Sequence, residues 1–310
     1  MEKLYDMLIV GGGPGGYTAA MYAARVGLNV AVLEKLSAGG QMALTSQVDN
    51  YPGFEDGVDG YDLAEKMERQ AQRFGADTVY AEVTAMELQG PVKLLQTSEG
   101  FFRGKTVVIA TGANSKKLGI KKEESLSGKG VHYCAACDGM RYRGKTVAVV
   151  GGGNTAAADA LALSRVAEKV FVIHRRDALR ATKIYHEPLM QADNVEFLWN
   201  SALSELIGEE KLSAIQVKNL ETQEVREIPC DGLFVSIGRA PATDLVAAQL
   251  TLDENGYILA GEDTVTSLGG VYAVGDVRQK LLRQIVTAVA DGATAAHSAE
   301  RYLAENVALW

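Results

Sequence analysis

Residues 7–20 read MLIVGGGPGGYTAA, an apolar segment that runs into glycines and then into small residues. Asp6–Val10 predicts a short strand that stops at the glycines, and Tyr17–Val26 predicts a helix. This strand–glycine–helix order is the context that the G-x-G-x-x-G fingerprint requires. Glycine lets the backbone approach a pyrophosphate, and the helix N-terminus offers N–H groups and partial positive charge. We therefore predict a dinucleotide site, whose fingerprint positions are Gly11, Gly13 and Gly16.

The same pattern occurs a second time at residues 146–163, TVAVVGGGNTAAADALAL. Thr146–Val150 predicts a strand, and a helix is expected to run to about Arg165. The fingerprint positions of this copy are Gly151, Gly153 and Ala156. The competing interpretation, in which both turns are merely tight loops, is disfavoured because both copies have the same strand-and-helix context. Two dinucleotide sites are therefore predicted.

More apolar strands follow each of the two helices. Val30–Leu33 and Val170–Ile173 are expected directly after the helices, and Thr106–Gly112 and Leu233–Gly238 close the two copies. Strand, glycine turn, helix and strand together describe a right-handed parallel unit. The predicted fold class is therefore α/β, with two doubly wound dinucleotide-binding domains.

The segments beyond the closing strands, Ala113–Lys117 and Arg239–Asp244, are natural places for the chain to pass from one domain to another. The tail from about Leu245 has its own glycine turn at Gly275-Asp276 and then a predicted helix. We expect this tail to complete the first domain, so that the second domain is inserted into the first. The predicted domains are residues 1–117 with 245–310, and residues 118–244.

The two copies differ in charge at the end of the second strand. The residue 23 positions after Gly11 is Glu34, whereas the residue 23 positions after Gly151 is His174. A carboxylate accepts hydrogen bonds from a ribose diol and repels a 2′-phosphate, so the first site fits FAD or NAD. The second copy continues with guanidinium groups, which suit phosphate oxygens, so it should prefer NADP(H). These groups belong to Arg175, Arg176 and Arg180. Their alternative interpretation is a solvated charged face.

A pair of cysteines, Cys134 and Cys137, lies just before the second glycine turn in the sequence CAACDG. Residues three apart on a helical turn lie about 5–6 Å apart, within the range that a disulfide accepts. The Cys-x-x-Cys spacing also lowers the pKa of one thiol from about 8.5 towards neutrality. Asp138 follows directly, and a carboxylic acid there can exchange a proton with the attacking or leaving thiol. The segment predicts a redox-active dithiol.

The pair has two other interpretations. The first is half of a zinc site, with His132 as a third ligand, and the second is a pair of inert thiols. Structural zinc sites usually need a second ligand pair, and the remaining cysteine, Cys230, lies on a predicted apolar strand and is expected to be buried. The four histidines form no ligand cluster in the sequence, so no metal site is expected.

The composition matches an ordinary globular protein. The chain has 310 residues, of which 47% are hydrophobic and 23% charged, and its net charge of −8 argues against binding to nucleic acid. The charge-free stretch Met7–Ala24 is interrupted by five glycines and a proline, so it is rejected as a membrane span. No secretory signal precedes the first strand, and three cysteines do not make a disulfide scaffold. A cytoplasmic location is therefore expected.

With these features in order, the chain resembles the low-molecular-weight, bacterial-type thioredoxin reductases, which are flavin disulfide reductases, across nearly its whole length. Few other families have Cys-x-x-Cys-Asp-Gly directly before a second glycine turn, so the combination is specific. The matching segments are Gly11–Gly16, Gly39-Gly40-Gln41, Asp49-Asn50-Tyr51-Pro52-Gly53, Ala110-Thr111-Gly112, Cys134–Gly139, Gly151–Ala156, His174–Arg180, and Gly275-Asp276 with Arg283-Gln284.

The resemblance implies FAD in the discontinuous domain, NADPH in the inserted domain, and a homodimer. The positions that match FAD contacts are Gly11, Gly13, Gly16 and Glu34, and those that match residues lining the flavin are Gln41, Asn50, Asp276 and Gln284. The positions that match NADPH contacts are Gly151, Gly153, Ala156, Arg175, Arg176 and Arg180. The redox pair is Cys134 and Cys137, and the acid/base is Asp138.

The implied reaction carries electrons from NADPH to FAD, then to the cysteine pair, and then to a disulfide of thioredoxin or a thioredoxin-like protein. Cys137 matches the thiol next to the flavin, whereas the cysteine that attacks the partner is left open. In such proteins the inserted domain rotates against the other domain, and the two predicted crossing segments suit a pair of hinges.

The chain also departs from the family pattern. Met140-Arg141 stands where a pair of aromatic residues often helps to dock thioredoxin, and Ala156–Asp159 has alanines where glutamates are common. The alternatives are a flavin-dependent dithiol oxidase, a reductase with a non-thioredoxin partner or a non-NADPH donor, the flavoprotein of a peroxide-reducing system, and a non-enzymatic nucleotide sensor. The cluster of three arginines counts against the oxidase, which would not need it.

Overall fold

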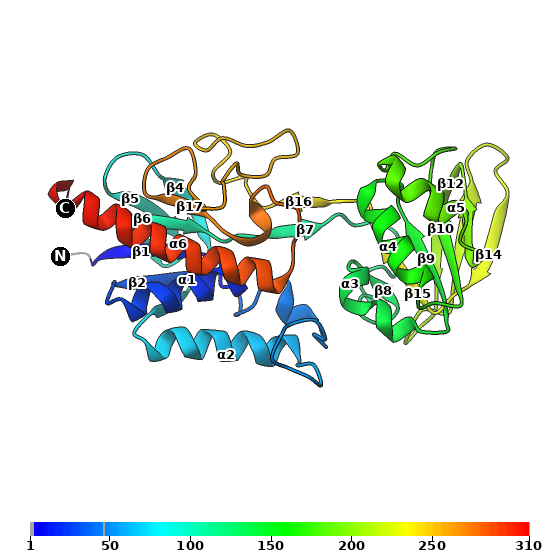
Figure 1. The fold of residues 1–310 in the computed structure, drawn as a ribbon, viewed down its shortest axis with the longest axis horizontal. Helices are drawn as coiled ribbons and strands as arrows, with labels where there is room; N and C mark the ends of the chain where they lie inside the picture. The colour runs from blue at the N-terminus through cyan, green and yellow to red at the C-terminus, as the bar shows by residue number, and fades with distance from the viewer. Residues whose placement is uncertain (1–2, 46, 310) are drawn as a thin grey trace. The chain divides into compact units, whose positions relative to one another are not determined.

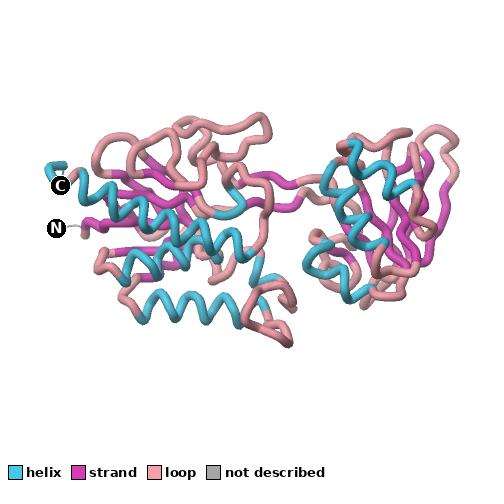
Figure 2. The backbone as a smooth tube through the Cα atoms, viewed as in Figure 1, coloured by secondary structure: helices cyan, strands magenta, loops and turns pink. Residues whose placement is uncertain are grey.

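The structure is a computed structural model that describes residues 3–45 and 47–309 (Figures 1 and 2). The chain divides into two compact units. The outer unit comprises Met1–Asn114 and Ala240–Trp310, and the inserted unit comprises Ser115–Arg239. The chain crosses between them along β7 (Ala113–Ser115) and β16 (Arg239–Pro241), which pair with each other as a two-stranded sheet.

A seven-stranded sheet forms the centre of the outer unit, in the order β3-β2-β1-β6-β5-β4, with β17 also paired to β6. Parallel pairing joins β3, β2, β1, β6 and β17. The pairs β4–β5 and β5–β6 are antiparallel. The bounds are β1 Leu4–Val10, β2 Val30–Glu34, β3 Asp77–Tyr80, β4 Val83–Glu87, β5 Lys93–Thr97, β6 Gly100–Ile109 and β17 Val271–Ala273. The closing strand therefore begins earlier than the predicted Thr106, because its first half pairs with β5.

The C-terminal helix completes this unit by packing along α1 (Figure 1). The close approach depends on Gly292, because a Cβ there would lie 2.2 Å from the carbonyl oxygen of Gly15. Alanines of both helices share one buried cluster with the parallel strands. The helices are α1 Pro14–Arg25, α2 Gly60–Arg73 and α6 Ile285–Glu305, with the short 3₁₀ segments η1 Met42–Leu44, η4 Gly275–Val277 and η5 Val307–Leu309.

The inserted unit is built on a five-stranded parallel sheet in the order β11-β10-β9-β15-β8. Its strands are β8 Val131–His132, β9 Thr146–Val150, β10 Lys169–Ile173, β11 Val195–Leu198 and β15 Gly232–Val235. An antiparallel sheet of β12 Ser201–Ile207, β13 Ala214–Asn219 and β14 Val225–Pro229 shares a buried cluster with one face. The helices α3 Ala135–Asp138, α4 Asn154–Ser164 and α5 His186–Met190 supply the cluster on the other face, together with η2 Gly139–Tyr142 and η3 Lys183–Tyr185.

Both units therefore contain the strand–glycine–helix–strand pattern that the sequence predicts, and the predicted fold class is confirmed. Registers such as Met7 opposite Val30 and Val170 opposite Val147 align the carboxyl ends of the parallel strands. In doubly wound sheets, ligands bind at this edge. Across residues 3–45 and 47–309, no helix combines the length and the apolar composition needed to span a membrane.

Candidate active site and nucleotide-binding turns

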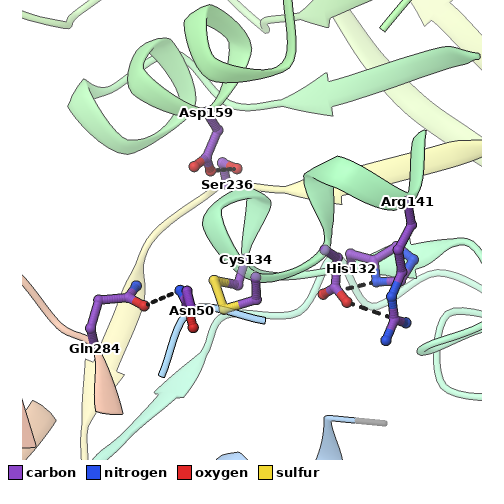
Figure 3. Close-up of a disulfide and its surroundings, with 9 residues drawn as sticks. Asn50, His132, Cys134, Arg141, Asp159, Ser236 and Gln284 are labelled. Atoms are coloured by element: carbon purple, nitrogen blue, oxygen red, sulfur yellow. Dashed lines mark hydrogen bonds and ion pairs between the residues drawn. A yellow bond between two sulfur atoms is a disulfide. The ribbon is translucent and has the colours of Figure 1, made fainter. Parts of the chain in front are cut away.

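The cysteine pair forms a disulfide at the start of α3, directly after β8 (Figure 3). Cys134 is the N-cap of this short helix and has an extended backbone, with φ −147° and ψ 102°. The backbone N–H groups of Cys137 and Asp138 donate to the carbonyl of Cys134, at 3.3 and 3.1 Å. This turn brings the two Cα atoms to 5.3 Å, and both cysteines are half-buried. The disulfide supports the redox interpretation of the pair.

The carboxylate of Asp138 has a partner on each oxygen. His132 Nδ1 lies 3.1 Å from Oδ2, and the Arg141 guanidinium lies 3.5 Å from Oδ1. The Asp138 side chain is 14% exposed, so it is largely buried but still open to exchange with a reactant. A carboxyl group next to the disulfide in sequence and anchored in this way can supply or accept protons.

His132 has a partner on each ring nitrogen. Its Nε2 lies 2.6 Å from the Tyr142 hydroxyl, and the ring stacks on Phe234 with centroids 5.4 Å apart. Burial raises the pKa of Tyr142 to about 12, and the negative charge of Asp138 adds to this effect. Both His132 nitrogens are thus engaged within the protein and both cysteines are in a disulfide, which is not the arrangement of a zinc site. The described residues contain no cluster of three or more potential metal ligands.

The third cysteine, Cys230, is 3% exposed. The prediction that it is buried is confirmed, but its placement on a strand is wrong, because it lies between β14 and β15. Burial raises the pKa of its thiol to about 12, and the neighbouring Asp231 carboxylate contributes. A thiol this hard to ionise is a poor nucleophile at neutral pH.

The first glycine turn provides an open cradle in the outer unit. Gly11 has φ +105°, and a Cβ on it would lie 2.4 Å from the carbonyl oxygen of Ala110. A Cβ on Gly16 would lie 2.0 Å from the carbonyl oxygen of Gly11, whereas Gly13 has no atom within 4 Å of that position. Backbone atoms therefore leave no room for a side chain at Gly11 or Gly16, whereas the space beside Gly13 is open, as binding of a pyrophosphate requires.

Two polar side chains lie beside this turn. The Glu34 carboxylate accepts hydrogen bonds from the N–H of Gly12 at 2.7 Å and of Leu36 at 3.1 Å. The Tyr17 ring is 1% exposed, lies against the same glycine, and its hydroxyl has no hydrogen-bond partner within residues 3–45 and 47–309. Burial raises the pKa of this hydroxyl. An orphaned buried hydroxyl beside a carboxylate at an open glycine turn fits a ligand with ribose and phosphate groups.

The residues that match flavin-lining positions come from distant parts of the outer unit. The Asn50 amide donates to Gln284 Oε1 at 2.9 Å (Figure 3), and Gln41 Nε2 donates to Asn114 Oδ1 at 3.3 Å. Gln284 is also the N-cap of α6 and forms a capping box with Thr287. Asp276 lies in η4, just after β17. The structure joins Asn50 to Gln284 directly, although 234 positions separate them.

Sequence reasoning missed the buried group that supports η4. Asp291 is 6% exposed and accepts hydrogen bonds from the Gly275 N–H, Arg278 and Lys280, at 2.7 to 3.0 Å. Burial alone would raise the pKa of Asp291, but the hydrogen bonds from Arg278, Lys280 and Gly275 outweigh it and lower the pKa. The one feature of the sequence that indicates this buried group is Asp291 itself, a single acidic residue among alanines on one face of the predicted helix.

The second glycine turn has the same backbone design. Gly151 has φ +145°, and a Cβ on it would lie 2.4 Å from the carbonyl oxygen of Ser236 and 2.8 Å from the Cβ of Ala156. Gly153, like Gly13, has no atom within 4 Å of its Cβ position. The three predicted fingerprint positions therefore lie together at the start of α4, with open space at Gly153.

His174 occupies the position that corresponds to Glu34, and its ring lies against Gly152. Burial lowers the pKa of His174, and the positive charges of the following arginines lower it further. Its Nε2 has no hydrogen-bond partner in the part of the chain that the structure describes. The backbone N–H of Arg180 donates to the Gly152 carbonyl at 2.7 Å, which joins the arginine segment to the glycine turn.

The three predicted arginines, Arg175, Arg176 and Arg180, are all exposed. Within residues 3–45 and 47–309, none of their guanidinium groups forms an ion pair. Exposed guanidinium groups beside an open glycine turn suit a phosphate ester.

A half-buried carboxylate, Asp159 of α4, lies near the end of β15. Ser236 Oγ donates to its Oδ2 at 2.5 Å (Figure 3). Burial raises the pKa of Asp159, although the hydrogen bond and the charge of Arg239 oppose this rise. The sequence singled out Asp159 only as part of a departure from the family pattern.

Comparison with known proteins agrees with this geometry. Residues 5–292 match the family described as pyridine nucleotide-disulphide oxidoreductase. The chain belongs to this family. The predicted class, a flavoprotein disulfide reductase that uses FAD and NADPH, is confirmed.

Within the family, the chain belongs with the thioredoxin reductases. It is 43% identical to the thioredoxin reductase of Streptomyces clavuligerus, over 98% of this chain and 95% of the relative. It is 42% identical to that of Treponema pallidum, over 98% of both chains. The crystal structure of thioredoxin reductase from Streptococcus pyogenes superposes with a TM-score of 0.92 at 42% identity, covering 98% of this chain and all of that one. The resemblance predicted from the motifs is therefore confirmed.

Proposed function

We propose that this protein passes electrons from NADPH through FAD to the disulfide of Cys134 and Cys137, and then to a disulfide of thioredoxin or a thioredoxin-like protein. The observation that carries the proposal is the disulfide itself. It lies in a unit with a nucleotide-binding turn, 14 positions before the first glycine of that turn. A dithiol alone occurs in many classes of protein. A dithiol in a chain that also has two dinucleotide-binding turns is typical of a reductase that takes electrons from a nicotinamide.

FAD is assigned to the outer unit, residues 1–117 and 245–310 in the predicted division. The open position at Gly13, the Glu34 carboxylate and the unpartnered Tyr17 hydroxyl support this assignment. When bound, FAD supplies a two-electron relay between the nicotinamide and the disulfide. The residues assigned to hold it are Gly11, Gly13, Gly16, Glu34, Gln41, Asn50, Asp276 and Gln284.

NADPH is assigned to the inserted unit, residues 118–244 in the predicted division. The exposed guanidinium groups beside the second turn favour a ligand with a 2′-phosphate over NADH. The acidic Glu34 at the corresponding place in the first turn disfavours the same ligand there. The residues assigned to hold NADPH are Gly151, Gly153, Ala156, Arg175, Arg176 and Arg180.

The chain's own chemistry is thiol–disulfide exchange. The S–S bond of Cys134 and Cys137 breaks on taking up two electrons, which come ultimately from NADPH, and two protons. A thiolate of the reduced pair then attacks the partner's disulfide and forms a mixed disulfide. The second cysteine attacks this bond, which restores the Cys134–Cys137 disulfide and releases the partner as a dithiol with both electrons and both protons. Asp138 is assigned to carry the proton at the thiol that leaves or attacks.

The surface proposed to dock the partner differs from the family pattern at Met140-Arg141. Met140 is 55% exposed, and Arg141 contacts the Asp138 carboxylate, so these positions offer one exposed thioether where two aromatic rings are common. We infer a homodimer in the cytoplasm from the family resemblance. Sedimentation velocity of the purified protein tests the dimer, and a single species at the monomer mass would overturn it.

Steady-state NADPH oxidation tests the proposed function. Purified protein is mixed with NADPH and oxidised thioredoxin, and in parallel with NADPH and oxygen alone. The proposal predicts rapid oxidation that requires thioredoxin and comes with an equal amount of new partner thiol. Oxidation as fast with oxygen alone, with no new thiol, would favour the oxidase instead. A panel of small thioredoxin-like proteins then identifies the preferred partner.

A further inference from the structure

The histidine that precedes the disulfide, His132, contacts the assigned acid and lies in an enclosed setting. It is 4% exposed, on the short strand β8, two positions before Cys134. Its Nδ1 lies 3.1 Å from Asp138 Oδ2. Its ring stacks on Phe234 with an interplanar angle of 27°, and it meets Tyr142 edge-on with centroids 5.3 Å apart. Because aromatic rings contact both its face and its edge, the imidazole has little freedom to turn.

The hydrogen-bond partners determine which nitrogen carries the proton. An ionised carboxylate can only accept hydrogen bonds, so Nδ1 must be the N–H that donates to Asp138. In this tautomer the imidazole has an acceptor at Nε2, and the Tyr142 hydroxyl, 2.6 Å away, donates to it. Burial raises the pKa of Tyr142 to about 12, so its hydroxyl keeps its proton at neutral pH. The Asp138 carboxylate thus selects the tautomer, and Tyr142 supports it by donating to Nε2.

The backbone around Asp138 gives its side chain little support. Asp138 ends a four-residue helix and starts the 3₁₀ segment η2. The Arg141 guanidinium on the other oxygen lies 3.5 Å away on a side chain that is 31% exposed, so water screens this contact. His132 is therefore the buried and fixed partner of the carboxylate.

We propose that His132 is a positioning residue for the redox pair: its Nδ1–H holds one oxygen of Asp138 in place, and the Tyr142 hydroxyl supports this arrangement by donating to Nε2. This inference rests on the proposed role of Asp138. When the Cys134–Cys137 bond takes up two electrons, both protons come from solvent, and Asp138 relays one of them to a thiolate. His132 stabilises the Asp138 carboxylate before it takes up that proton and again after it has passed the proton on. No atom is transferred to the histidine.

Two amide substitutions separate the two nitrogens of the ring. Asn in His132→Asn places its Nδ2 where Nδ1 lies and keeps a donor for Asp138. Gln in His132→Gln reaches towards Tyr142 instead and leaves Asp138 without this donor. Both variants bury one amide at the same site, so a purely structural role predicts the same effect for both. His297→Asn, at a histidine side chain that is 81% exposed on α6, is the control.

Steady-state kinetics of the full-length holoenzyme with thioredoxin is the first measurement. We expect His132→Gln to lower kcat about 10-fold, the size expected for one hydrogen bond to a charged group, with both KM values within about 2-fold. His132→Asn should keep kcat within about 3-fold of the wild type. Equal losses in the two variants would overturn the proposal, and so would wild-type kcat in His132→Gln.

A second measurement does not depend on the partner. The reduced proteins are alkylated with iodoacetamide across a pH series, and the tryptic peptide 130–141, which contains both cysteines, is quantified. The curve of His132→Gln should follow that of Asp138→Asn, whereas His132→Asn should follow the wild type. The other charged or titratable groups around this cluster are Arg141 beside Asp138, Lys145 over the Tyr142 ring, and Asp231 and Cys230 near Tyr142. None of them is changed in the variants.

The kinetic and alkylation measurements distinguish a failure of the proposed function from a failure of the proposal for His132. A wild type that does not reduce any thioredoxin-like protein would contradict the proposed function, and alkylation would still test His132. If a His132 variant does not fold, Tyr142→Phe takes its place, because it removes only the hydroxyl that holds Nε2 of the ring. That variant should shift the alkylation curve towards that of Asp138→Asn, and an unchanged curve would overturn the proposal.

Discussion

The outer and inserted units have the same glycine turn but opposite charge beside it. Gly11 and Gly151 both adopt positive φ, and the third fingerprint position packs closely against each of them. At the end of the next strand, however, the outer unit has Glu34, bound to the N–H of Gly12, and the inserted unit has His174, whose ring lies against Gly152. Because the backbones correspond, the choice of nucleotide must lie in these side chains and in the arginines that follow.

The units also differ in what supports the site. The outer unit holds η4 against α6 through Asp291 and its two cationic partners, Arg278 and Lys280. The inserted unit instead places a disulfide beside its own turn in sequence. One unit therefore depends on a buried ion-pair cluster, whereas the other carries the reactive group. Each difference can be broken by a substitution that leaves the other unit intact.

The largest effect is expected at the disulfide. Cys137→Ser should lower the thioredoxin-reducing rate by at least about 1,000-fold, because exchange cannot proceed without the second sulfur. Bleaching of the bound flavin by NADPH should continue, since the outer unit and both nucleotide sites are unchanged. The matched control is Cys230→Ala, whose buried thiol takes no part in the chemistry. Full NADPH-dependent reduction of thioredoxin by Cys137→Ser would contradict the account.

Next in size is the loss of the buried carboxylate of the outer unit. Asp291→Asn should destabilise that unit by about 3–5 kcal/mol, because Arg278 and Lys280 then keep buried charges without a carboxylate partner. Calorimetry should show a lower melting temperature for the outer unit and little change for the inserted unit. Equal shifts of both transitions would contradict the difference drawn between the units.

The pH dependence of this effect has a definite sign. The folded-state pKa of Asp291 lies below its ordinary value of 3.8, so its stabilisation is fully present above pH 3.8 and is lost as the pH falls below that value. The difference in unfolding free energy between the wild type and Asp291→Asn should therefore be constant near neutral pH and shrink under acid conditions. A difference that grows on acidification would contradict the lowered pKa.

The arginine cluster is expected to produce a smaller but selective effect. Arg175→Ala with Arg180→Ala should raise the KM for NADPH about 100-fold, because two charge-assisted hydrogen bonds to the 2′-phosphate are lost. The KM for NADH should change by less than about 3-fold. Arg165→Ala, at an exposed arginine of the same unit, is the control. Equal losses for both nucleotides would remove the assignment of the 2′-phosphate.

The smallest effect is expected at the corresponding position of the outer unit. Glu34→Gln should weaken FAD binding about 10-fold, because a neutral amide is a poorer acceptor for the ribose and for the Gly12 N–H. Flavin release followed by fluorescence measures this without reference to turnover. The control is Glu87→Gln, at an exposed glutamate of β4. Unchanged flavin retention in Glu34→Gln would place the ribose elsewhere.

The repeated strand–glycine–helix pattern can be predicted from the sequence because local sequence determines it. A strand that stops at glycines and continues as a small-residue helix places the turn wherever it occurs, so both glycine turns and the α/β fold class could be predicted. The disulfide was predictable for the same reason, since its two cysteines share one short turn. The antiparallel β4–β5 hairpin was not anticipated.

The contacts that the sequence did not predict join residues brought together by the fold. His132 meets Asp138 because β8 pairs with β15 and places Phe234 under the imidazole ring. Asp291 meets Gly275 because η4 folds back against α6. Spacing in the sequence contains neither pairing, and a histidine beside two cysteines suggested zinc as readily as an anchored acid.

An anaerobic titration of the yellow protein with NADPH, followed by addition of oxidised thioredoxin, tests the proposed electron path from NADPH through FAD to the cysteine pair. Absorbance is recorded throughout. We expect NADPH to bleach the flavin and thioredoxin to restore its colour, because the electrons leave through Cys134 and Cys137. A flavin that NADPH does not bleach would contradict the assignment of the two nucleotides to the two units.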